Sequence, residues 1–135
     1  MPLVEDSNPF AYPAPIWTLF RSTPRAGGFA PGTPGVVTGE AQSNAARSRL
    51  RLQLRFERGR VADARFRAYG CPTSIAVGAW LAGWAVGKDV RELAGLSAAR
   101  LRKELEIPDQ RAHCALLGED ALRAVLDRLP EDPSP

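Results

Sequence analysis

The sequence predicts an α+β fold, in which a small antiparallel sheet of about three strands carries helices packed on one face. Two observations favour this arrangement. In residues 49–56, RLRLQLRF, apolar side chains alternate with basic or amide side chains, a period of two that is typical of a half-buried strand. From residue 72 onward, apolar side chains instead recur at helical spacing.

The composition is that of one soluble globular domain. The chain has 135 residues, 44% of them hydrophobic and 24% charged, which is enough for a single core. We expect a flexible arm at residues 1–14, the domain at 15–130 and a disordered tail at 131–135. The longest apolar run, residues 75–87, is too short to cross a bilayer as a helix. With no basic leader and two distant cysteines, a cytoplasmic protein with reduced thiols is expected.

The N-terminal third is rich in Pro, Gly, Ser and Ala, so loops are expected there. A short apolar segment at residues 16–20 predicts a docking helix. A short strand is predicted at residues 36–38.

Two longer strands are predicted as a β-hairpin. The first covers residues 49–56, a turn containing Gly59 follows at 57–60, and the second covers 61–69. The second strand is expected to share the buried face of the first through its alternating residues, Ala62, Ala64, Phe66 and Ala68.

Helices are predicted for the rest of the chain. Pro72 fits the first helical position, and the helix is expected to run to about Val86. Gly78 and Gly83 inside it predict close packing against a neighbour. Two short helical segments follow, the second capped by Ser97 and stopped by Pro108. A last amphipathic helix is predicted at residues 114–129.

The few soft metal ligands of this chain stand at helix starts. Cys71 precedes one predicted helix, and His113 with Cys114 begins another. The partial positive charge of a helix N-terminus favours a thiolate, and two thiolates with an imidazole can ligate zinc or iron. We therefore expect both sulfurs and a His113 ring nitrogen to converge to about 3 to 4 Å. The alternative is that the cysteines are small buried hydrophobes and the histidine is a surface or capping group.

Longer stretches resemble one family. ADARFRAYGCPTSIA, the apolar helix after it, GKDVRELAGL and IPDQRAHCALLGEDALRAVL resemble the IscU/NifU N-terminal iron–sulfur cluster scaffold family in the right order and spacing. LFRSTPRAGG resembles the family's early helix and turn, so the resemblance spans residues 16–129. It implies an IscU/NifU-like fold and a role in iron–sulfur cluster assembly as a scaffold and not as an enzyme.

The resemblance also implies a ligand set. The family's site has three cysteines, an aspartate and a histidine, of which this chain matches Cys71, His113 and Cys114. The first cysteine position falls on Ala46 and the aspartate position on Ser48. A register shift of one residue would place them on Ala45 and Arg47 instead.

These departures limit the expected cofactor. Clusters usually need about four protein ligands, and one chain offers three. Iron or a [2Fe–2S] cluster is expected, with zinc as the alternative, and any stable cluster would bridge two protomers of a homodimer. Cys114 resembles the family's acceptor of persulfide sulfur, which implies a cysteine desulfurase as partner. The competing hypothesis is a divergent paralogue that binds zinc or no metal and acts by protein–protein contact, for example on a desulfurase.

Other partners are less favoured. The family's chaperone-binding motif keeps only Pro108 and Arg111 in residues 107–111, so chaperone binding is not expected, and neither is a membrane. Arginines on the predicted hairpin form a basic stripe. We interpret the stripe as a solvated sheet face in preference to a surface for an acidic partner or nucleic acid, because aromatic side chains are nearly absent there. The stripe comprises Arg49, Arg51, Arg55, Arg65 and Arg67.

Overall fold

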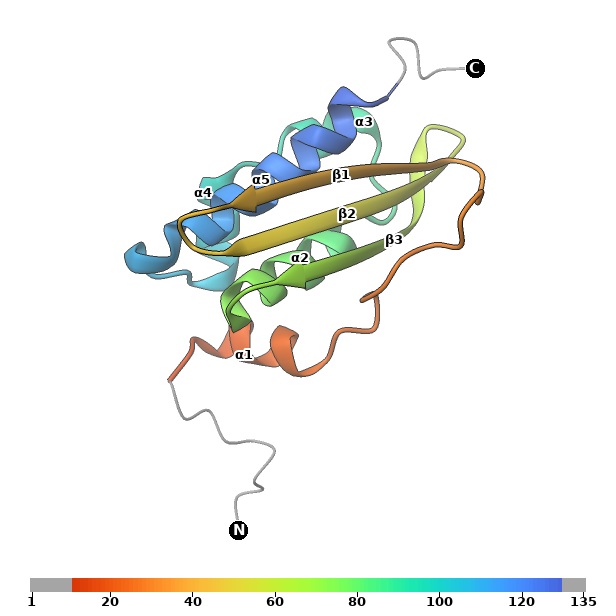
Figure 1. The fold of residues 1–135 in the computed structure, drawn as a ribbon. Helices are drawn as coiled ribbons and strands as arrows, with labels where there is room; N and C mark the ends of the chain where they lie inside the picture. Colours follow the sequence, from red (N-terminus) through yellow and green to blue (C-terminus); the bar gives the residue numbers. More distant parts are fainter. Residues whose placement is uncertain (1–10, 130–135) are drawn as a thin grey trace.

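A computed structural model describes residues 11–129 (Figure 1). The predicted tail and most of the predicted arm lie outside these residues. The strands are β1 (Val36–Ser43), β2 (Ser48–Glu57) and β3 (Arg60–Tyr69). The helices are α1 (Ala14–Arg21), α2 (Pro72–Ala85), α3 (Val90–Ala94), α4 (Ala98–Leu105) and α5 (Ala112–Asp127), with a short 3-10 helix, η2 (Asp109–Arg111), before α5. None of the helices in the described residues is long and apolar enough to span a membrane.

The three strands form one antiparallel sheet in the order β1-β2-β3, as predicted. β1 extends to Ser43, well beyond the predicted residues 36–38, and pairs with β2 along its whole length. Its polar, glycine-containing sequence TGEAQS has weak strand propensity, and pairing with β2 overrides that weakness. The β2–β3 turn has Arg58 and Gly59 at φ of 55° and 78°, the positive values that a tight two-residue hairpin turn requires.

At the start of β3, the side chains face the sides of the sheet opposite to those predicted. A register shift after Arg55 pairs Phe56 with Val61, so β3 carries an extra residue at this point. Val61 is buried and Ala62 is exposed, which reverses the prediction at that end of the strand. Beyond the bulge, Ala64 and Phe66 are buried against the leucines of β2, as predicted.

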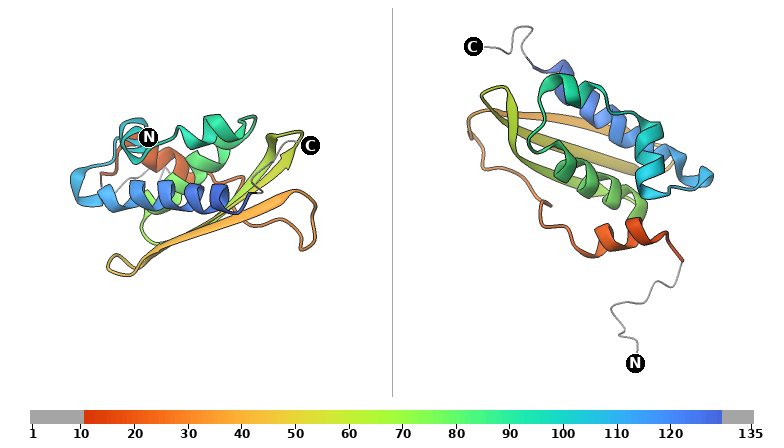
Figure 2. Two further views of the ribbon diagram at one scale, coloured as in Figure 1. Left: turned by 90° about the horizontal axis from the view of Figure 1, so that it is seen from above. Right: turned by 180° about the vertical axis from the view of Figure 1, so that it is seen from behind.

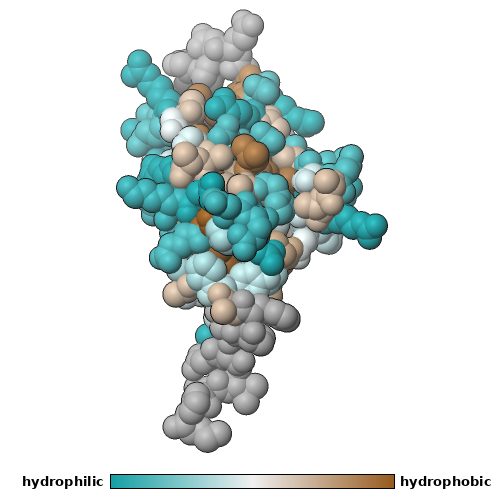
Figure 3. Space-filling model, turned by 90° about the vertical axis from the view of Figure 1, so that its left-hand side faces the viewer, coloured by the Kyte–Doolittle hydropathy of each residue, from teal (hydrophilic) through white to brown (hydrophobic). Residues whose placement is uncertain are grey.

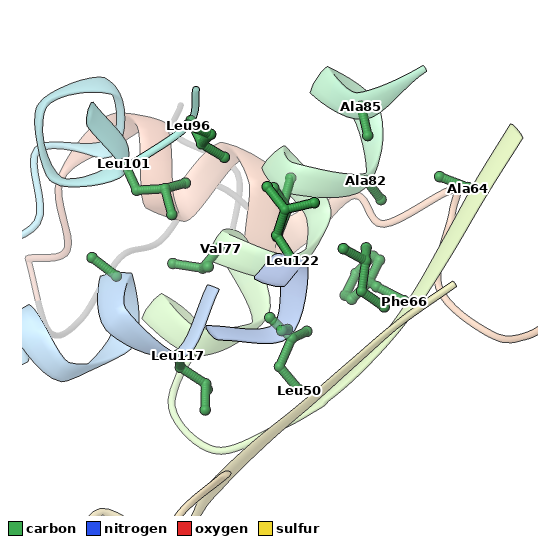
Figure 4. Packing of buried hydrophobic residues seen from close by; sticks show 14 of the residues in the cluster. Leu50, Ala64, Phe66, Val77, Ala82, Ala85, Leu96, Leu101, Leu117 and Leu122 are labelled. Atoms are coloured by element: carbon green, nitrogen blue, oxygen red, sulfur yellow. The ribbon is translucent and has the colours of Figure 1, made fainter. Parts of the chain in front are cut away.

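The helices cover one face of the sheet, and the core lies between the two layers (Figure 2). Side chains from β2, β3, α2, α4 and α5 meet there (Figure 4). The predicted docking helix is confirmed, since α1 packs against α2 and buries Ile16 completely. Burying this apolar surface is the main favourable contribution to folding.

The two glycines of α2 differ. A Cβ built on Gly78 would lie 2.5 Å from Phe66 Cδ2 and 3.0 Å from Leu50 Cδ1, so the predicted close packing is confirmed there. At Gly83 nothing lies within 4 Å of such a Cβ, and the prediction is wrong for this residue. Gly83 faces away from the core, so no neighbour demands a glycine there.

Candidate thiol site

Cys71 lies at the junction between β3 and α2. Gly70 before it has φ of 140°, and a Cβ on Gly70 would lie 2.8 Å from Ser48 Oγ, so the backbone here approaches β2 closely. Cys71 is the N-cap residue of α2 and Pro72 is its first residue, as the sequence predicts. The junction therefore holds the thiol at a helix N-terminus.

His113 and Cys114 lie in the first turn of α5, so their predicted place at a helix N-terminus is confirmed. The helix begins at Ala112, directly after η2, and not at the predicted residue 114. The 3-10 turn adds helical structure ahead of the apolar stripe, which the hydrophobic pattern alone does not reveal. Cys114 thereby points into the core and is 0% exposed.

The two thiols meet at the end of the sheet where the β1–β2 turn and the starts of α2 and α5 come together (Figure 1). Cys71 Sγ and Cys114 Sγ are 4.0 Å apart. Ser74 Oγ lies 3.8 Å from Cys71 Sγ and 3.4 Å from Cys114 Sγ. Ser74 in turn donates to Ser48 Oγ at 3.4 Å. Cys71 is half-buried, whereas Cys114, Ser74 and Ser48 are buried.

The contact between the thiols separates their acidities. A hydrogen bond from Cys114 lowers the pKa of Cys71 well below its ordinary value, and backbone N–H groups at the start of α2 lower it further. The same bond to Cys71, together with burial, raises the pKa of Cys114 well above its ordinary value. These opposite shifts in pKa favour the thiolate at Cys71 and the protonated thiol at Cys114.

His113 does not complete a three-residue site. It is half-buried in the first turn of α5, and between residues 11 and 129 no three His, Cys, Asp or Glu side chains are placed to hold a metal ion. The two sulfurs do approach one another as predicted. The roles of Cys71, His113 and Cys114 as metal or cluster ligands remain a prediction, and two thiols alone do not fit a cluster that needs about four ligands.

Ser48, on which the resemblance places the family's aspartate, is linked to the thiols by hydrogen bonds. Ser48 reaches Cys114 through Ser74, and its hydroxyl also donates to the Ala46 carbonyl at 3.3 Å. Ser74, which the sequence analysis missed, stands three residues after Cys71 in the first turn of α2, a spacing that brings side chains onto one helix face. A cavity of about 360 Å³ opens beside Ser48, and Arg47 and Arg49 also line it.

The surface at this end of the molecule is mainly hydrophilic, with hydrophobic residues only in small separate patches (Figure 3). The arginines of the outer sheet face vary in exposure: Arg49 and Arg67 are exposed, and Arg65 pairs with Asp63 at 2.9 Å.

A three-stranded antiparallel sheet with helices on one face and a strand–Cys–helix junction defines a small α+β domain. The chain belongs to the family of NifU-like N-terminal domains, whose model matches residues 12–133. The predicted family is thus confirmed.

Relatives with assigned names are similar over most of the chain. Iron-sulfur cluster assembly protein 3 of Arabidopsis thaliana is 31% identical over 78% of this chain, which spans 62% of the plant protein's length. The iron-sulfur cluster assembly scaffold protein IscU of Haemophilus influenzae is 33% identical over 67% of this chain and 73% of its own. The Drosophila melanogaster relative, 35% identical over 67% of this chain and 60% of its own, is named an assembly enzyme.

Solved structures share the fold. A candidate iron–sulfur scaffold protein for the SUF system from Fervidobacterium islandicum superposes with a TM-score of 0.69 at 16% identity, over 85% of this chain and 96% of that one. A NifU-like protein from Brucella abortus gives a TM-score of 0.65 at 17% identity, over 85% of this chain and 94% of that one.

Proposed function

We propose that this protein acts in iron–sulfur cluster assembly as a scaffold-like protein that receives sulfur from a cysteine desulfurase at its thiol pair. The observation that carries the proposal is the pair itself: a half-buried thiol and a buried thiol 4.0 Å apart at adjoining helix starts. The names of the relatives support a role in cluster assembly and do not favour the alternative of a paralogue that acts only by contact.

The proposed cargo is sulfur, together with iron, and not a complete cluster held by one chain. Ala46 cannot donate a ligand, and Ser48 offers a neutral hydroxyl in place of a carboxylate. A single iron or zinc ion bound by Cys71, His113 and Cys114 would require His113 to turn toward the sulfurs, and its fourth ligand would be water or an exogenous thiol.

The test is sulfur transfer from a cysteine desulfurase with cysteine as its substrate, under anaerobic conditions. We expect intact-mass spectra of the wild-type protein to show either the gain of one sulfur atom or the loss of two hydrogen atoms, the mass change of a disulfide. A Cys71→Ser/Cys114→Ser double variant should gain none. Wild-type protein that remains unchanged while the desulfurase turns over would contradict the proposal.

A further inference from the structure

The two cysteines differ in their exposure to solvent. Cys71 is half-buried at the surface end of a helix, whereas Cys114 is 0% exposed. A macromolecular sulfur donor must bring its own sulfur into contact with the acceptor, and of the two cysteines only Cys71 is partly exposed. The one reactive sulfur within reach of Cys114 is that of Cys71, at 4.0 Å.

Both sulfurs contact the same hydroxyl. Ser74 Oγ lies 3.8 Å from Cys71 Sγ and 3.4 Å from Cys114 Sγ, and Ser74 in turn donates to Ser48 on β2. The sulfurs themselves are 4.0 Å apart, and a disulfide requires them to close to about 2.05 Å.

We propose that Cys71, and not Cys114, is the residue that first accepts sulfur, and that Cys114 resolves the resulting Cys71 persulfide, releasing sulfide and leaving a Cys71–Cys114 disulfide. The proposal deepens the proposed function, on which it rests, by assigning the acceptor and the product. It also replaces the expectation, taken from the family resemblance, that Cys114 is the acceptor.

The chemistry balances in two exchanges. Cys71 Sγ attacks the outer sulfur of the donor persulfide, a bond forms between them, and the donor cysteine leaves as a thiol. Cys114 Sγ then attacks Cys71 Sγ and breaks the bond to the outer sulfur. That sulfur leaves as sulfide with the Cys114 proton and is reduced, while the two cysteine sulfurs are oxidised to the disulfide. An external dithiol reductant restores the pair.

The experiment treats the reduced full-length protein with inorganic polysulfide, and in parallel with a cysteine desulfurase plus cysteine, both without added reductant. We expect one sulfide released for each Cys71–Cys114 disulfide formed, the disulfide being located by peptide mass mapping. In Cys114→Ser, sulfide release should be lost and a persulfide should accumulate on Cys71. In Cys71→Ser, no sulfur should be taken up.

Thermal melting of each variant, followed by circular dichroism, shows whether it is folded, and mapping of wild-type protein needs no variant. A persulfide located on Cys114, or a wild-type Cys71 persulfide that persists without sulfide release, would overturn the inference. If polysulfide gives the disulfide and sulfide but the desulfurase does not, the thiol chemistry stands and the proposed function falls. If the desulfurase delivers sulfur to Cys114, the proposed function stands and this inference falls.

Discussion

At the scale of the residue, the lowered pKa of Cys71 predicts how its reactivity changes with pH. Because the thiolate is the nucleophile and the pKa of Cys71 is lowered, its alkylation rate should stay nearly constant from about pH 8 to pH 6. An ordinary thiol, with a pKa of about 8.5, loses roughly tenfold in rate for each pH unit below that value. Rates measured with iodoacetamide and read by peptide mass mapping test this, and the buried Cys114 should react much more slowly than Cys71.

Removing the Cys114 thiol should change the pH dependence of Cys71 alkylation. Cys114→Ala takes away the hydrogen bond that lowers the pKa of Cys71, so the midpoint of its alkylation should rise by about one pH unit or more, equivalent to about 1.4 kcal/mol. Cys114→Ser retains a donor of similar size and is the matched control, with a smaller rise expected. Identical midpoints in all three proteins would show that the thiol contact does not set the acidity.

At the scale of elements, the glycines of α2 give a paired test of packing. Gly78→Ala would place a Cβ 2.5 Å from the Phe66 ring and should destabilise the fold by about 1–3 kcal/mol. Gly83→Ala meets nothing within 4 Å and should stabilise it by about 0.5–1 kcal/mol, because alanine loses less backbone entropy in a helix. Urea denaturation measures both, and equal effects would contradict this packing.

The outer face of the sheet offers a second comparison. Arg51 and Arg67 stand directly opposite one another on β2 and β3, and like charges in such pairs are destabilising. Arg67→Glu should therefore stabilise the protein by roughly 0.2–1 kcal/mol. Arg65→Glu on the same strand is the control: it removes the ion pair with Asp63 and should destabilise. Denaturation at low and high salt should show both effects shrinking as charges are screened.

Sequence patterns predicted the elements well where apolar side chains recur at regular spacing. They predicted poorly those features that depend on local backbone geometry. The alternation in β2 and the Gly70–Cys71–Pro72 junction predicted the hairpin and the start of α2. The β-bulge that buries Val61 leaves no mark in the alternation, because it depends on pairing with another strand. The exact start of α5 could not be predicted either, since η2 adds a helical turn ahead of the apolar stripe.

At the scale of the whole molecule, one chain holds too few ligands for a cluster. Each chain has two cysteines and one histidine, so two protomers together offer four cysteines and two histidines. We predict that any [2Fe–2S] cluster bridges two protomers related by two-fold symmetry and that loading and dimerisation rise together. Sedimentation of anaerobically reconstituted protein, with iron counted in each fraction, measures this. A loaded wild-type monomer would refute it.

Sedimentation with iron counted in each fraction should give a different result for an Ala46→Cys/Ser48→Asp variant. Ser48 contacts Ser74 beside the thiols and donates to the Ala46 carbonyl, so the variant places a thiol and a carboxylate where the family resemblance puts them. Iron should then move toward the monomer fraction. Ser48→Asp alone supplies no thiolate and serves as the control, with loading expected to stay tied to the dimer.

The closeness of the two thiols also has a practical consequence for cell biology. Trivalent arsenicals bridge neighbouring thiols, because arsenic prefers two soft sulfur ligands, and they cannot bridge a disulfide. An arsenical affinity resin should therefore retain the reduced protein, with Cys71 and Cys114 both free, and let the oxidised protein pass. The ratio of the two fractions, taken directly from cells in different growth conditions, would report how much of the protein carries the reduced thiol pair and how much carries the disulfide.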